Sequence, residues 1–157
     1  MTFKYKSKTS PSQIKQVHAK YMEHVRDAII KRFTLIGWKF VKMAREKTAK
    51  QGGFDDHSGN LRSSIGFVVV DHGEIVYGDF EPAKKGKDQE TGLKEAKKLT
   101  RELASNFSEG YALIVVAGMD YAAAVESKGK DVITGSSLQA EIDLKDAVRK
   151  MKMNGKI

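Results

Sequence analysis

The chain has 157 residues, of which 40% are hydrophobic and 31% charged, and it contains no cysteine. This composition excludes a collagen-like, a wholly disordered and a membrane-bundle protein, and the missing thiols exclude disulfides and cysteine nucleophiles. No apolar run approaches the roughly 20 residues of a membrane-spanning helix, and the polar start is not that of a signal peptide. We therefore expect a flexible basic arm at residues 1–10 and a single domain at residues 11–157.

The net charge of +8 is concentrated in the first third of the sequence. Residues 1–50 hold 13 Lys and Arg against three acidic residues, a net charge of +10, while residues 51–157 hold 15 against 17, a net charge of −2. Such an asymmetry is typical of a protein with a polyanionic neighbour, although a solvated helix face explains it equally well. On the first interpretation, the residues that contact DNA or an acidic partner recur every three helical turns and are Lys20, Lys31 and Lys42.

A long N-terminal helix, over about residues 11–50, is the first predicted element. Ser10 is placed to cap this helix, with Gln13 completing a capping box and Pro11 at the first helical position. Gly52 supplies the left-handed residue that typically ends a helix.

Apolar residues occupy two sides of this helix. An early stripe consists of Ile14, Val17, Tyr21, Val25 and Ala28. Past Gly37 the apolar face is rotated, so the helix is covered on two sides, by its own sheet and by a second subunit, or it breaks at Gly37 into two one-sided helices. On the two-sided interpretation Trp38 is partly exposed in the isolated chain, and the subunit interface contains Ile30, Trp38 and Val41.

Strand patterns follow the helix. Residues 64–70 and 74–78 predict a hairpin around the turn at residues 71–73. The continuous apolar run at residues 111–118 is typical of a central strand that is buried on both faces. Val132 and Ile133 add a short strand, which brings the sheet to about four strands.

Three further helices are predicted. They cover about residues 93–107, residues 120–126 with Asp120 as the cap, and residues 136–151 with a capping box that starts at Ser136 and Gly155 after the end. The order of elements predicts an α+β fold. In this fold, an antiparallel sheet of about four strands packs against the long N-terminal helix, and a C-terminal helix closes the domain.

No motif in the sequence predicts an active site. Asp55, Asp56 and His57 are adjacent in a loop, where residues rarely converge on one ion without distant partners, and no nucleophile elbow or phosphate-binding loop occurs. We interpret Asp55 or Asp56 as an Asx-turn residue that accepts backbone N–H groups ahead of the first strand. The sequence therefore predicts a protein that is not an enzyme and uses no metal, cofactor, small-molecule substrate or membrane.

Two separated segments resemble motifs of small phage proteins. DHSGNLRSSI at residues 56–65 resembles the D-T-G-x-L-R-x-S-I signature that opens the first strand, and MDYAAAVESKG at residues 119–129 resembles Y-A-x-Y-V-E-x-G. Both motifs belong to the tail-completion, neck and minor tail proteins of long-tailed double-stranded DNA phages and prophages. The residues that we assign to the two motifs are Gly59, Leu61, Arg62, Ser64, Ile65, Tyr121, Ala122, Val125, Glu126 and Gly129.

The resemblance implies a structural role at the head–tail junction of a virion. Such a protein is made in the host cytoplasm, assembles with itself into a ring and binds neighbouring connector or tail proteins, without catalysis. Residues 81–108 depart from the family's layout and are expected to be an insertion with its own helix. A nucleic-acid-binding module that uses the basic first third is the alternative function.

The first motif also predicts local geometry. In a strand, Leu61 and Ile65 face the same way while Arg62 faces the other, and Gly59 permits a tight turn into that strand. Arg62 then either clamps the Glu126 carboxylate or lies on the surface without a partner.

Overall fold

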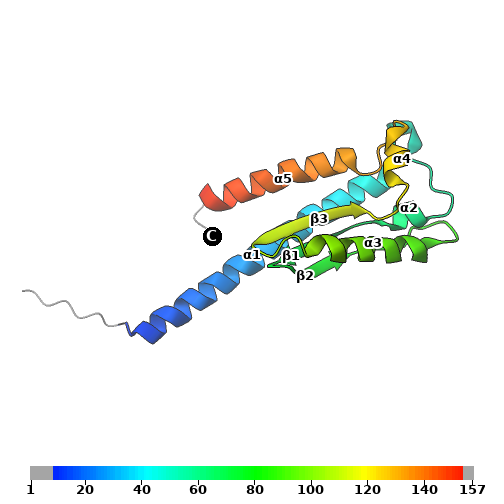
Figure 1. Cartoon of the computed structure of the whole chain (residues 1–157). Coiled ribbons are helices and arrows are strands. Elements are labelled where there is room, and N and C mark those ends of the chain that lie inside the picture. The colour runs from blue at the N-terminus through cyan, green and yellow to red at the C-terminus, as the bar shows by residue number, and fades with distance from the viewer. Residues whose placement is uncertain (1–8, 154–157) are drawn as a thin grey trace, which may run out of the picture.

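The computed structural model describes residues 9–153 and has the expected α+β fold (Figure 1). Residues 1–8 of the predicted arm and Gly155 lie outside the described residues. None of the helices in the described part of the chain is long and apolar enough to cross a membrane. The elements are α1 (Pro11–Glu46), the 3-10 helix η1 (Ala49–Gln51), α2 (Asn60–Ser63), β1 (Ile65–Asp71), β2 (Glu74–Asp79), α3 (Gln89–Ala104), β3 (Tyr111–Ala117), α4 (Ala122–Ser127) and α5 (Thr134–Met153).

The sheet has three strands in the order β2-β1-β3, with both pairs antiparallel. The predicted hairpin is confirmed, but the expectation of about four strands is wrong. Val132 and Ile133 form no strand, because their backbone N–H groups donate to the Glu126 carboxylate at 3.2 and 2.9 Å. β3 is an edge strand and β1 the central one. The expectation that residues 111–118 form a central strand buried on both faces is therefore wrong, because only Ile114 and Val116 of β3 are buried and its other residues are half-buried.

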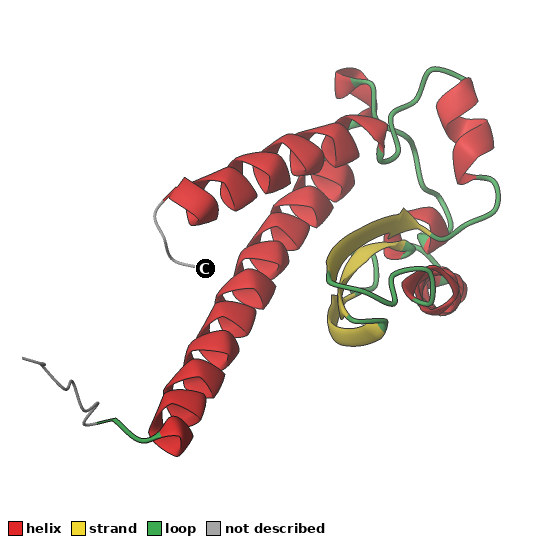
Figure 2. Cartoon of the chain, turned by 60° about the vertical axis from the view of Figure 1, so that its left-hand side comes forward, coloured by secondary structure: helices red, strands yellow, loops and turns green. Residues whose placement is uncertain are grey.

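The domain has three layers, with α1 and α5 on one face of the sheet and α3 on the other (Figure 2). Phe67 and Val69 of β1 face α1, whereas Val68 and Val70 face Ala96 of α3, as the period of two in a strand requires. The helix predicted within residues 81–108 is confirmed, and it is a layer of the core that the sheet needs on its second face.

The long helix α1 is covered on two sides by its own chain. Ile36 and Phe40 pack in one cluster with Ala140 and Ala147 of α5, while Phe33 packs against Phe67 of the sheet. α5 therefore covers the second apolar side of this part of α1, the side for which the sequence predicted a second subunit.

The alternative of two helices that break at Gly37 is wrong, since α1 runs through Gly37 as a continuous helix. A Cβ atom at Gly37 would lie 2.2 Å from the ring of Phe67. Gly37 thus lets the helix backbone lie against the sheet.

The predicted start of α1 is confirmed, whereas the predicted end of α1 and the predicted starts of α4 and α5 are wrong. Ser10 caps α1 and forms the predicted box with Gln13, but the helix ends at Glu46, earlier than expected. The predicted Asp120 cap is wrong because α4 begins after Tyr121. Ser136 does not start α5, which begins two residues earlier and leaves Ser136 buried inside the helix.

Replacing Gly37 with Ala is expected to lower the free energy of unfolding by about 1–3 kcal/mol, because the added methyl overpacks against Phe67. Ala is otherwise the better helix former by about 1 kcal/mol. Chemical denaturation measures the change. In a Phe67→Leu background the cost of Gly37→Ala should shrink by about 1 kcal/mol or more, which a double-mutant cycle detects. A gain in stability from Gly37→Ala alone would contradict the close approach.

Candidate interaction surface

The first motif forms a turn and the short helix α2 at one end of the body. The Asp56 carboxylate accepts the N–H of Gly59 at 2.9 Å and of Arg62 at 2.7 Å, which confirms an Asx-type role for Asp56. Gly59 has a φ of +81°, in the left-handed region that favours glycine. The expected strand geometry of Leu61 and Ile65 is wrong because Leu61 lies in α2. Both side chains are nonetheless buried in the same cluster.

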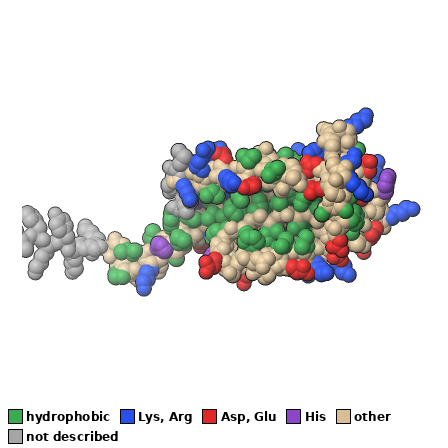
Figure 3. Space-filling model, turned by 45° about the horizontal axis from the view of Figure 1, so that its top comes forward, with side chains coloured by type: hydrophobic (Ala, Val, Ile, Leu, Met, Phe, Trp, Pro, Cys, Tyr) green, Lys and Arg blue, Asp and Glu red, His purple; other side chains and the backbone are tan. Residues whose placement is uncertain are grey.

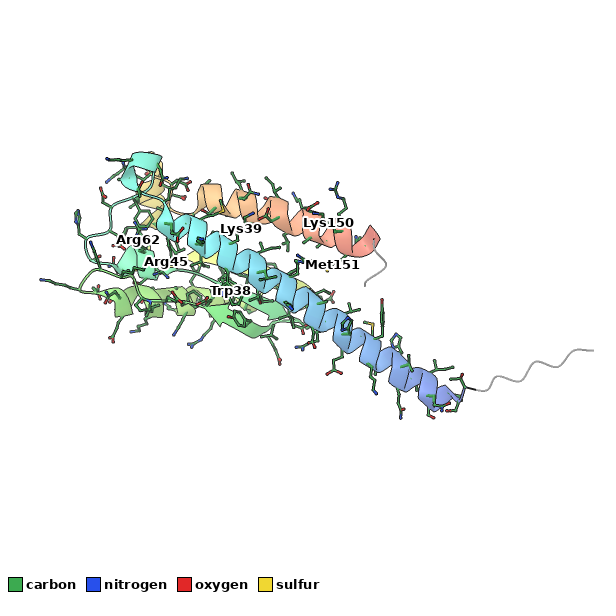
Figure 4. All side chains as sticks on the ribbon, turned by 180° about the vertical axis from the view of Figure 1, so that it is seen from behind. Trp38, Lys39, Arg45, Arg62, Lys150 and Met151 are labelled. Atoms are coloured by element: carbon green, nitrogen blue, oxygen red, sulfur yellow. The ribbon has the colours of Figure 1, made fainter. Side chains whose placement is uncertain are left out.

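Arg62 points to the end of α1, beside Arg45 (Figure 4). Its guanidinium donates to the Arg45 carbonyl and, at 3.2 Å, to the Phe54 carbonyl, and it lies 4.8 Å from the Phe54 ring centre. The carbonyl of Arg45 belongs to the last turn of α1, where carbonyls have no partner within the helix. Both expectations for Arg62, a Glu126 clamp and a surface position without a partner, are therefore wrong.

Ser63 and Ser64 of the first motif are fully buried, and their hydroxyl groups are hydrogen-bonded. The Ser63 hydroxyl donates to the Gly59 carbonyl at 2.5 Å and accepts the Ala83 N–H at 2.8 Å. The Ser64 hydroxyl donates to the Leu61 carbonyl at 2.8 Å. The Ser63 hydroxyl thus holds the segment before α3 against α2, and the Ser64 hydroxyl closes the end of α2.

Glu126 of the second motif holds the start of α5. One carboxylate oxygen accepts the N–H groups of Val132, Ile133 and Thr134 at 2.9–3.2 Å, and the other accepts the Thr134 hydroxyl at 2.9 Å. Burial acts to raise the pKa of Glu126, but these hydrogen bonds outweigh it and lower the pKa. Gly129, at a φ of +77°, turns the chain back toward this carboxylate.

The two motifs meet in space. The Tyr121 hydroxyl donates to the Asn60 side-chain oxygen at 2.5 Å, and burial, followed by the charge of Asp56, raises the pKa of Tyr121. Ala122 and Val125 of α4 are partly buried against the main core cluster. Lys47, just after α1, forms an ion pair with Asp131, just before α5. The motifs thus form one corner that joins the end of α1, α2, α4 and the start of α5.

The polar groups of this corner serve the fold. Asp55 and His57 are exposed, and no group of three or more His, Cys, Asp or Glu among residues 9–153 is arranged to hold a metal ion. The exposed apolar side chains and the exposed lysines that could bind a partner lie elsewhere, along α1.

The first part of α1 projects from the body (Figures 1 and 2). We call residues 11–24 the α1 projection. Three apolar side chains of the predicted stripe are exposed on it, Ile14 at 57%, Val17 at 69% and Tyr21 at 44%, and the first buried residue of α1 is Val25.

The projection leaves the body where α1 is tied to the end of β1. Arg26 donates to the Asp71 carboxylate at 2.6 Å, and His72 Nδ1 lies 2.5 Å from the other oxygen of that carboxylate. Burial acts to raise the pKa of Asp71, but the hydrogen bonds from His72 and Arg26 lower it. The ion pair fixes the point at which α1 loses contact with the sheet.

Trp38 is the member of the predicted subunit interface that stays exposed, at 42%. Its Nε1 donates to Asp79 of β2 at 2.7 Å, and its ring meets Tyr77 edge-on with the ring centres 6.0 Å apart. Ile30 and Val41 are partly buried against the chain's own sheet, so their side of α1 faces β1 and β2. An interface role for Trp38 stays a prediction.

The three lysines predicted to contact DNA or an acidic partner, Lys20, Lys31 and Lys42, are exposed. Within the described residues they form no ion pair. Three other cations of the basic first third are paired with acidic side chains from later in the sequence: Arg26 with Asp71, Lys39 with Asp143 and Lys47 with Asp131. The first third therefore presents less free positive charge than its composition indicates.

Comparison with models of protein families, with curated protein sequences and with solved structures found no match. Function is therefore inferred from the geometry of this chain and from the resemblance of its two motifs.

Replacing Glu126 with Gln is expected to lower the free energy of unfolding at neutral pH by roughly 1–2 kcal/mol, because a charged acceptor of several backbone N–H groups is lost. The folded pKa of Glu126 lies below its ordinary value of 4.5. The stability that the carboxylate contributes is thus fully present above pH 4.5 and is lost as the pH falls through the folded pKa. The difference in the free energy of unfolding between the wild type and the Glu126→Gln variant should therefore become smaller below pH 4.5.

Denaturation curves across this pH range measure this difference. Glu109→Gln, at an exposed loop position, is the matched control and should cost no more than about 0.5 kcal/mol. A gap for Glu126→Gln that is constant with pH would mean that the charge of Glu126 does not stabilise the start of α5.

Proposed function

We propose that this chain is a structural protein of the phage head–tail junction, which acts by binding copies of itself and neighbouring virion proteins, without catalysis. The observation that carries the proposal is the α1 projection, a helix that holds an apolar stripe in water. Helix segments of this length are only marginally stable alone, and exposed apolar patches mark interaction sites. A binding partner for the projection explains both features.

The motif corner supports the same proposal. The residues that resemble the phage family are used for internal hydrogen bonds and packing, as with Glu126 at the start of α5 and Arg62 at the end of α1. A corner of this kind sets the angle between helices, which is what an assembling protein needs. It offers no free nucleophile or unpaired buried acid for chemistry.

In a phage or prophage that encodes this chain, the protein is expected in purified particles, where mass spectrometry detects it. Deleting its gene should leave heads and tails that fail to join, because the structural link between them is lost. Electron microscopy scores the joined particles, and expression of the wild-type chain from a plasmid should restore them. Normal infectious particles from the deletion strain would overturn the proposal.

A nucleic-acid-binding module is the second candidate, and the exposure of Lys20, Lys31 and Lys42 favours it. The variant with all three changed to Gln should keep its stability to within about 0.5 kcal/mol per site, because the changes are on the surface. If the chain binds DNA through these lysines, the slope of log K against log salt should fall by roughly 0.9 for each lost phosphate contact. Salt-dependent binding measurements test this. If both the slope and the particle yield are unchanged in the variant, the three lysines are ordinary solvated surface residues that contact no DNA.

A further inference from the structure

The exposed stripe of the projection lies on the side of α1 that α5 covers farther along. At 100° per residue, Ile14 and Tyr21 share this side with Arg32 and Lys39. Arg32 and Lys39 line a hollow between the two helices together with Met151 of α5. Figure 4 labels Lys39 and Met151 on the two helices. The stripe is thus the uncovered continuation of a helix–helix interface that the chain makes with itself.

The charge around the stripe selects the kind of surface that can cover it. The α1 projection carries Lys15 and Lys20 against the single acidic residue Glu23. His18 and His24 border the stripe on its two sides, and Glu23 lies on the opposite side of the helix. Two projections paired with each other would therefore bring like charges together, whereas an apolar surface with an acidic rim complements the projection.

One hollow of this chain has an apolar lining and an acidic rim. The α3–β3 hollow, of about 180 Å³, is lined by the apolar side chains of Leu99, Ala117 and Met119. Its charged residues are Glu95, Glu102, Asp120 and Lys98, an excess of two negative charges. Three other hollows each hold more cationic than anionic residues. Figure 3 shows hydrophobic side chains that gather along the body between α5 and α3 and histidine and basic side chains on the projection.

The projection and the α3–β3 hollow lie at opposite ends of the sheet. The projection leaves the body at Asp71, which pairs with Tyr111 at the start of β3, while Ala117 at the end of β3 lines the hollow. Contact between two different patches on identical chains is head-to-tail, and it leaves each copy with one free projection and one free hollow. Such contacts close into rings or extend as filaments.

We propose that the α1 projection of one copy docks on the α3–β3 hollow of a second copy. Val17 and Tyr21 cover Leu99 and Met119, and the lysines of the projection face Glu102 and Asp120 on the rim. This inference rests on the proposed function and names the contact by which copies of the chain would join.

Three variants of the full chain test the contact. The projection variant carries Val17→Asp and Tyr21→Asp, and the hollow variant carries Glu102→Lys and Asp120→Lys, all at exposed positions. The control, Leu138→Asp, changes an apolar residue of α5 that is 57% exposed and belongs to neither patch. Circular dichroism establishes that each variant is folded. Sedimentation velocity then measures association over a concentration series at low salt, and removal of residues 1–8 checks that these residues are not the cover.

The wild type, the control and the shortened chain should associate equally, and the projection and hollow variants should each associate at least about tenfold more weakly. An equimolar mixture of the two weakened variants should form a 1:1 dimer and nothing larger, because one intact projection meets one intact hollow. A wild type that stays monomeric, a projection variant that associates normally, or a mixture that forms no dimer would overturn the contact.

The particle experiment separates this inference from the function on which it rests. If wild-type protein is found in particles while the mixture forms no dimer, the docking contact fails and the proposed function stands. If the mixture forms the dimer but the deletion strain makes normal particles, the proposed function fails and the self-association stands.

Discussion

The contact between Gly37 and Phe67 sets the position of the long helix, and the rest of the structure follows from it. Because Gly37 has no side chain, the backbone of α1 lies directly on the ring at the centre of the sheet. The helix therefore crosses the sheet without a bend and offers one side to β1 and another to α5. With 36 residues, α1 is about 54 Å long, whereas a strand of seven residues spans about 23 Å. A straight helix of this length must extend past the sheet, and the α1 projection is the part that does.

Charge attaches this helix to the domain. Arg26, Lys39 and Lys47 lie along α1 and just after it, and each meets a carboxylate from a later element. Part of the contrast between a basic first third and a slightly acidic remainder is thus an internal complementarity. The positive charge that remains free is carried by residues such as Lys20 and Lys31, on the outer surface of the helix.

Features that depend on a few neighbouring residues could be predicted from the sequence. The Ser10 cap and the turn at Asp56 use partners within six positions, and the hairpin pairs residues at most 12 positions apart, so all three are local. The α+β order also follows from the period of the apolar residues. The strand count fails at Val132 and Ile133, whose branched side chains suit a strand but whose N–H groups are taken by Glu126.

Long-range partners left no signal in the sequence. The carbonyl groups that bind Arg62 carry no residue type, so an acidic partner was the natural but wrong expectation. Periodicity shows that α1 has two covered sides, but it cannot tell a second subunit from α5, about 100 positions later. Ion pairs such as Lys39 with Asp143 are likewise invisible without the fold.

The contacts that hold α5 are spread along the helix. Its start is held where Glu126 accepts backbone N–H groups, and farther along Asp143 pairs with Lys39 while Ala140 and Ala147 pack on α1. The helix has 20 residues, so its far end lies about 30 Å from the N–H groups that Glu126 holds. A change in the direction of α5 at the corner would have to break the Lys39–Asp143 ion pair and the packing on α1, so these contacts and the corner together fix the angle between the two helices.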